Sequence, residues 1–166
     1  MMQRRLFGSA VLLGALSACG FQLRQSPNYS FRTLFSGLPE TSAFGQELKR
    51  NIASSGQVEV ISDPKQVERA DVIFDLLQEL PEKVILSRTS AGAVREFQLR
   101  FRIRFKLRTR DGIELIPDTE LVQERDISFN ETAALSKETE EALLYRDMRS
   151  DLVQQVLRRL AVVRMP

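Results

Sequence analysis

The chain has 166 residues with 24 basic and 22 acidic side chains, for a formal net charge of +2, and it contains one cysteine and no histidine. The absence of histidine excludes imidazole bases, histidine-activated nucleophiles and the commonest metal ligand. The sequence also lacks a paired-carboxylate motif, a glycine-rich phosphate loop and a metal-ligand spacing. We therefore expect a protein that is not an enzyme and that uses no cofactor or metal.

Residues 1–18 have the three regions of a secretion signal. Arg4 and Arg5 precede an apolar run, residues 6–16, and small residues then lead into Cys19. The run is 11 residues long, whereas a helix needs about 20 to cross a bilayer. We expect this segment to be removed on export rather than to anchor the protein as a helix.

The residues Leu16-Ser17-Ala18-Cys19 form a lipobox, which predicts that Cys19 is the lipid attachment site and the first residue of the mature protein. Such an N-terminus carries more than one acyl chain, and two chains suffice for stable anchoring. The alternative is a chance cysteine behind an ordinary signal. Residues 19–30 are then a lipidated N-terminus and a polar tether, and residues 31–166 are a single domain.

The first part of the domain predicts one strand and one helix. Residues 31–38 alternate weakly between apolar and polar side chains before Pro39, which is typical of a strand. Ser42 is expected to cap a helix that runs to about residue 54. Residues 58–61 indicate a short extended piece, and residues 62–70 a loop or at most one turn of helix.

Three further strands are predicted in the middle of the chain. Alternation from residue 71 to about 86 indicates a strand with a bulge or an edge position at Pro81. Residues 96–110 give the clearest signal, because apolar side chains alternate with polar and mostly basic ones over a dozen positions. A turn at residues 88–93 joins these two strands. A last strand is expected over residues 120–130.

A long helix closes the chain. Ser136 is expected to cap it, which places Lys137 at its first position, and it reaches about Leu160. The predicted fold is α/β, a two-layer sandwich in which two helices pack on one face of a four-stranded mixed sheet.

The polar face of the strand at residues 96–110 carries five cations and has two interpretations. It is either an anion-binding surface or a solvated face paired with acids on the neighbouring strands, at roughly 0.2–1 kcal/mol for each directly opposed pair. Pairing is favoured for most of them. Nucleic acid is not an expected partner, because removal of Arg4 and Arg5 leaves 22 basic against 22 acidic residues. The five cations are Arg100, Arg102, Arg104, Lys106 and Arg108.

Two other basic residues are candidate ligand contacts. A lysine beside the free amides of a helix N-terminus makes a phosphate or carboxylate site, so Lys137 is such a candidate. The alternative is a solvated lysine whose charge is offset by Glu138, Glu140 and Glu141. Arg88 begins the predicted turn and is either an ordinary surface arginine or a further anion contact.

Two stretches resemble the lipopolysaccharide-assembly lipoprotein family LptE. They are Cys19-Gly20-Phe21-Gln22-Leu23-Arg24 and the sequence from Ala134 to Glu141 that continues into residues 152–160. The resemblance implies an outer-membrane lipoprotein on the periplasmic side, and Gly20 after the cysteine fits outer-membrane sorting. It implies as partner the β-barrel protein LptD, which family members plug, and as ligand the lipopolysaccharide that the pair inserts into the outer leaflet.

The resemblance also implies ligand-binding residues. The family's basic residue at the start of the last helix falls on Lys137, and its basic residue at the turn after the second long strand falls on Arg88. Arg100 and Arg102 are further candidate contacts to lipopolysaccharide. An alternative function is a lipid-anchored periplasmic binding module for another amphiphile or a peptide, and a third is a hydrolase.

Overall fold

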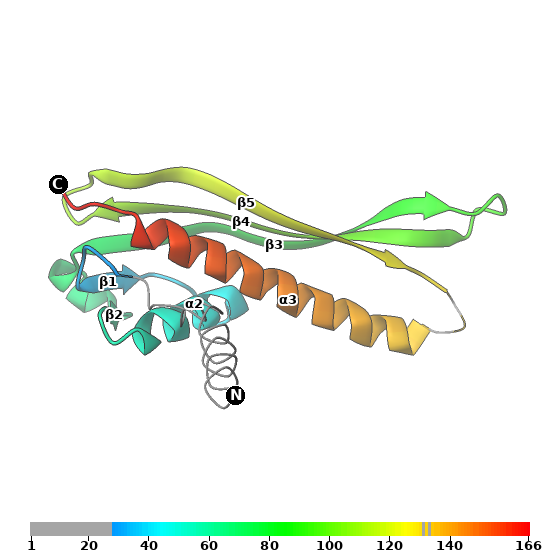
Figure 1. Cartoon of the computed structure of the whole chain (residues 1–166), viewed down its shortest axis with the longest axis horizontal. Coiled ribbons are helices and arrows are strands. Elements are labelled where there is room, and N and C mark those ends of the chain that lie inside the picture. Colours follow the sequence, from blue (N-terminus) through cyan, green and yellow to red (C-terminus); the bar gives the residue numbers. More distant parts are fainter. Residues whose placement is uncertain (1–27, 131, 133) are drawn as a thin grey trace, which may run out of the picture.

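The computed structural model describes residues 28–130, 132 and 134–166. The predicted signal at residues 1–18, the lipid attachment site Cys19 and most of the tether lie outside the described residues. The described chain forms a mixed sheet with two helices packed along one side of its long strands (Figure 1). No helix within the described part of the chain is long and apolar enough to cross a membrane.

The sheet has five strands, so the prediction of four was wrong. Their order is β2-β1-β3-β4-β5, with β1 parallel to both its neighbours and the remaining pairs antiparallel. The additional strand is the short extended piece, which pairs in parallel with the first strand from Thr33↔Glu59 to Phe35↔Ile61. Three residues are too few to show a period of two. The strands are β1 (Thr33–Ser36), β2 (Glu59–Ile61), β3 (Val72–Arg88), β4 (Val94–Thr109) and β5 (Glu114–Ser128).

The first helix forms as the sequence predicts, whereas the last one begins earlier. The helix α2 (Ala43–Ser54) is capped by Ser42, whose side chain accepts a hydrogen bond from the backbone N–H of Gly45. The helix α3 (Ala134–Ala161) starts two residues before Ser136. Ser136 is therefore not its cap, and Lys137 is not at its first position. Alanine and leucine, which precede Ser136, are strong helix formers and extend the helix backwards. A 3₁₀ helix (Pro64–Arg69) occupies the predicted loop.

The sequence predicts either a bulge or an edge position at Pro81. The strand β3 has both features, but only the edge position is at Pro81 and the bulge lies earlier in the strand. Pro81 pairs with Phe101 without a register shift, while the first irregularity lies between Leu76 and Gln78. The pairing of β1 with β3 ends at Phe74. Beyond Phe74, β3 has no second strand neighbour among the described residues, so Pro81 lies at an open edge, where a missing N–H breaks no ladder bond.

The last strand starts earlier than predicted, at Glu114 rather than near residue 120. It therefore includes Pro117, which the sequence placed before it. β5 is the outer strand of the sheet, and an edge strand tolerates proline because one of its two sides forms no ladder.

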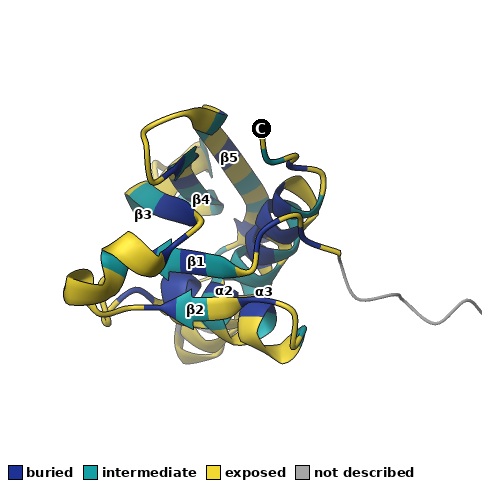
Figure 2. Ribbon diagram, turned by 90° about the vertical axis from the view of Figure 1, so that its left-hand side faces the viewer, coloured by how far each residue is buried: buried dark blue, intermediate teal, exposed yellow. Residues whose placement is uncertain are grey.

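The core lies between the sheet and the two helices. In the end view, exposed residues lie on the outer sides of the elements and buried ones toward the middle (Figure 2). The alternation predicted for β4 is confirmed, because its apolar side chains from Leu99 to Leu107 are buried. The side chains that meet them include Phe44, Leu48 and Ile52 of α2 and Met148, Leu152, Val156 and Leu160 of α3. At the other end, the β3–β4 hairpin extends past the start of α3 (Figure 1).

Candidate functional site

Lys137 lies in the first turns of α3, next to the end of β5. Its amine donates hydrogen bonds to the hydroxyl of Ser128 at 3.2 Å and to the carboxylate of Glu140 at 2.8 Å, and its side chain is 21% exposed. Because it is the fourth residue of the helix, the argument from free amides at the first helical position does not apply. Glu140, one of the three glutamates of the alternative interpretation, accepts a hydrogen bond from the amine, but Ser128 of β5 accepts one as well.

Lys83 on β3 is a second lysine at this place, and the sequence did not single it out. Its amine lies 2.5 Å from a carboxylate oxygen of Glu141 on α3 and 4.3 Å from the centre of the Phe97 ring. A cavity of about 120 Å³ is lined by both lysines together with Phe97, Phe129, Glu138 and Glu141. The structure thus brings two amines from different elements to one small cavity.

The bulge in β3 explains why Lys83 was missed. One extra residue between Leu76 and Gln78 shifts the alternation, so that the side chains of Glu79, Pro81 and Lys83 lie on the helix side. Uninterrupted alternation would have placed Lys83 on the opposite face from Leu76. The sequence predicts a bulge or an edge position at Pro81, but the bulge lies between Leu76 and Gln78, where no local signal marks it.

Arg88 lies where β3 ends, at the turn of the hairpin. Its guanidinium donates a hydrogen bond to the backbone carbonyl of Gly92 at 3.0 Å, so the side chain folds back over its own turn. Gly92 has a positive φ of 85°, which the turn requires and which glycine adopts without strain. The turn and the start of α3 lie at the same end of the molecule (Figure 1).

Arg100 and Arg102 lie on the other face of the sheet. Successive side chains of a strand point to opposite faces, and the neighbouring Phe101 is buried against Tyr145 of α3. Arg100 pairs with Glu124 at 3.0 Å, and Arg102 lies between Glu82 at 3.6 Å and Glu120 at 3.5 Å. The four candidate residues therefore do not form one site.

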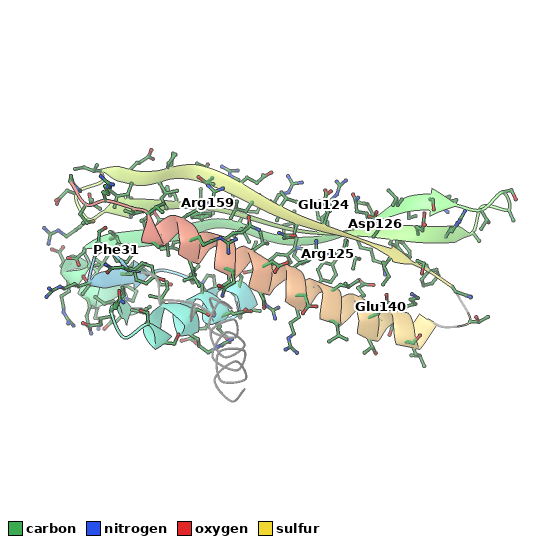
Figure 3. The ribbon with its side chains drawn as sticks, viewed as in Figure 1. Phe31, Glu124, Arg125, Asp126, Glu140 and Arg159 are labelled. Atoms are coloured by element: carbon green, nitrogen blue, oxygen red, sulfur yellow. The ribbon has the colours of Figure 1, made fainter. Side chains whose placement is uncertain are left out.

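The cations of β4 are mostly paired across the sheet. Arg104 contacts Asp118, and Arg108 contacts Asp75 at 2.9 Å. The hydrogen bond from Arg104 holds the pKa of the Asp118 carboxyl below its ordinary value. Along β5, Glu124 and Asp126 point to this face, whereas Arg125 points toward α3 (Figure 3), where its guanidinium lies 3.1 Å from Asp151. This arrangement favours a paired polar face over an open anion-binding one.

A larger cavity of about 810 Å³ lies between the open edge of β3, the start of α2 and the middle of α3. The hydroxyl of Tyr145 donates a hydrogen bond of 2.6 Å to the backbone carbonyl of Glu82 beside it. Burial raises the pKa of this phenol, and the charges of Glu141 and Glu82 raise it further. The side chains that line the cavity include Leu76, Leu77, Pro81, Lys83, Phe101 and Tyr145.

Three solved structures that are similar to this chain are named as lipoproteins. The chain is 32% identical to lipoprotein B from Nitrosomonas europaea, with a TM-score of 0.72 and coverage of 86% of this chain and 90% of that one. Rare lipoprotein B from Shewanella oneidensis is 21% identical over 78% of this chain and 92% of its own, with a TM-score of 0.62. The minor lipoprotein from Acinetobacter baumannii, 17% identical, has the same TM-score over 84% and 100% of the two chains.

No curated protein matches the sequence. The family described as LptE, lipopolysaccharide-assembly, matches residues 31–160, which reach from the residues before β1 to the last turn of α3. Within the described residues, the match covers the five strands, α2 and all but the last residue of α3, and it agrees with the family resemblance of the sequence. The chain therefore belongs to the LptE family of lipopolysaccharide-assembly lipoproteins.

Proposed function

We propose that this chain is a non-catalytic outer-membrane lipoprotein, held at the periplasmic side by acyl groups on Cys19, that plugs and stabilises the LptD β-barrel in a 1:1 complex. The family match over residues 31–160 is the observation that carries this proposal. The lipobox supports the anchor, since two acyl chains bind a membrane stably. In this role the chain assists the assembly of lipopolysaccharide into the outer leaflet.

Lipopolysaccharide is a phosphorylated glycolipid, and its phosphates are the groups that basic residues of this chain would bind. Lys137 is the first candidate, and Lys83 shares its cavity. Amines at a partly enclosed site form charge-assisted hydrogen bonds with phosphate. Arg88 belongs to the same end of the molecule. Arg100 and Arg102 are weaker candidates, because they lie on the other face of the sheet and do not line this cavity.

Charge reversal at Lys137 tests the ligand. In full-length protein, Lys137→Glu should weaken lipopolysaccharide binding in vitro by about tenfold, which corresponds to roughly 1.4 kcal/mol. Lys65→Glu is the matched control, because Lys65 is exposed and belongs to the 3₁₀ helix at the opposite end of the molecule. Equal affinities of the two variants would contradict a role for Lys137.

Affinity purification tests the partner and the anchor. Tagged full-length protein extracted in detergent should bring down a large β-barrel protein, and mass spectrometry should find acyl groups on Cys19. Lys137→Glu should leave the barrel in the complex, since the proposal gives Lys137 a role toward the ligand only. A binding module for another amphiphile or a peptide would bring down no barrel, and an unmodified thiol at Cys19 would overturn the anchor.

A further inference from the structure

We propose that the large cavity beside β3 holds an acyl chain of the same glycolipid whose phosphates Lys83 and Lys137 bind. This inference rests on the proposed function and adds a second contact to it. The phosphate site is the 120 Å³ cavity between β5 and α3, and the acyl site is the 810 Å³ cavity beside the open edge of β3. Lys83 lines both cavities, so the two sites are adjacent.

The walls of the large cavity suit an apolar occupant. Its charged groups already have partners, because Glu79 accepts from the hydroxyl of Ser42 and Arg149 contacts Glu47 at 3.2 Å. An acyl chain therefore leaves no charge of the wall without a partner. Leucine, proline and aromatic side chains supply the apolar contact, and the volume lies within the range of about 300–1,000 Å³ that ligand pockets occupy.

The edge of β3 itself argues against a peptide strand as occupant. A strand added to a sheet edge needs a continuous row of backbone donors and acceptors. Pro81 has no N–H, so a strand that pairs with this edge finds no backbone donor at that position. An acyl chain needs no backbone donor.

The charges at the mouth match the polar part of the proposed ligand. The amines of Lys83 and Lys137 contact Glu141 and Glu140, and the two lysine side chains are 36% and 21% exposed. A doubly charged phosphate competes with a single carboxylate for such an amine. A phosphate there would lie next to the cavity that takes the acyl chain, which is the order of groups in a phosphorylated glycolipid.

A photoreactive lipid tests the site directly. Full-length protein in phosphatidylcholine vesicles would be exposed to lipid A that carries a diazirine in one acyl chain, and labelled peptides would be identified by mass spectrometry. We expect labels on β3 near Leu77 and on α3 near Tyr145. Labels confined to other elements would overturn the proposal, as would equally efficient competition by phosphatidylglycerol.

Variants in the wall separate this inference from the phosphate site. Leu77→Glu should weaken binding of lipid A at least tenfold, and it should fold because Leu77 is 44% exposed. Leu86→Glu is the matched control, since Leu86 is 48% exposed on the same strand and is not among the residues that line the cavity. Thr41→Trp fills the cavity without adding charge and should have the same effect as Leu77→Glu.

The deacylated, diphosphorylated backbone of lipid A completes the test. Wild type and Leu77→Glu should bind it equally, and Lys137→Glu should bind it more weakly. If Leu77→Glu and Thr41→Trp bind intact lipid A as the wild type does, the acyl site is wrong while the phosphate site stands. If Lys137→Glu also binds as the wild type does, the phosphate site of the proposed function fails with it.

Discussion

The carboxylate of Glu79 on β3 accepts a hydrogen bond of 2.5 Å from the hydroxyl of Ser42, which in turn accepts one of 2.7 Å from the N–H of Gly45. The second oxygen of Glu79 accepts from the N–H of Phe44 at 3.3 Å. A strand carboxylate therefore completes the cap of α2, where a negative charge also suits the helix dipole. This contact joins the helix to the open edge of β3 and forms part of the wall of the large cavity.

Removal of the Glu79 carboxylate should destabilise the start of α2. Glu79→Ala is expected to lower the free energy of unfolding by about 1 kcal/mol, because the N–H of Phe44 and the hydroxyl of Ser42 lose their acceptor. Urea denaturation at pH 7 measures the difference. Glu40→Ala is the matched control, since Glu40 is exposed and its backbone carbonyl, which accepts a hydrogen bond from the side chain of Gln46, is kept in the variant. A similar loss in both variants would contradict the capping role.

Substitution of Gly45 by alanine should destabilise the protein, which is the opposite of what helix propensity predicts. In an ordinary helix interior, Gly→Ala stabilises by about 1 kcal/mol. Here a Cβ on Gly45 would lie 2.8 Å from the hydroxyl oxygen of Ser42 and 3.0 Å from the Cβ of Leu38. We expect Gly45→Ala to lower the melting temperature, because the new methyl group displaces the cap. A higher melting temperature would show that Leu38 and Ser42 move aside without loss.

The strongest local signals predicted most of the fold. The alternation along β4 persists for a dozen residues and gave the strand and its buried face, and Ser42 gave the start of α2. The short β2 was not recognised as a strand, because a three-residue strand is defined by its pairing with β1 rather than by its own pattern. The start of α3 was set too late, because Ser136 looked like a cap although the residues before it favour a helix.

The candidate site depended on contacts between residues far apart in the sequence. The bulge after Leu76 cannot be read from local composition, and it alone turns Lys83 toward α3. The contact of Lys137 with Ser128 joins a helix to a strand across a loop, so no spacing rule predicts it. The pairing of the β4 cations with acidic residues of the neighbouring strands could be predicted from the sequence, because the order of the strands decides which residues lie opposite one another in a ladder.

The carboxyl group of Asp71 should make the free energy of unfolding depend on pH. Burial alone would raise the pKa of its carboxyl, but hydrogen bonds from the N–H groups of Arg32 and Thr33 and the charge of Arg32 together lower it. Because this pKa is lower in the folded than in the unfolded chain, the charged carboxylate stabilises the folded chain. The stabilisation is complete when the pH is above the pKa of the unfolded chain, about 3.9. The stabilisation is lost as the pH falls through the folded value.

The measurement compares unfolding of wild type and Asp71→Asn between pH 7 and pH 3. Asp71→Asn should be less stable at pH 7, by on the order of 1 kcal/mol after allowance for solvent screening, and the difference should shrink toward pH 3. Asp147→Asn removes the same charge at an exposed position of α3 and serves as the control. A difference that stays constant with pH would contradict the assignment to the charged carboxylate.

The packing of α3 on the sheet should dominate the stability of the domain. Leu152 is fully buried against the sheet, whereas Leu143, nine residues earlier on the same helix, is 52% exposed. Leu152→Ala should lower the free energy of unfolding by about 2–5 kcal/mol, because it removes apolar contact and leaves a cavity. Leu143→Ala should change it by less than about 0.5 kcal/mol, as surface substitutions do. Both substitutions replace leucine by alanine in one helix, so propensity cancels between them. Equal effects in urea denaturation would mean that the helix buries a different face.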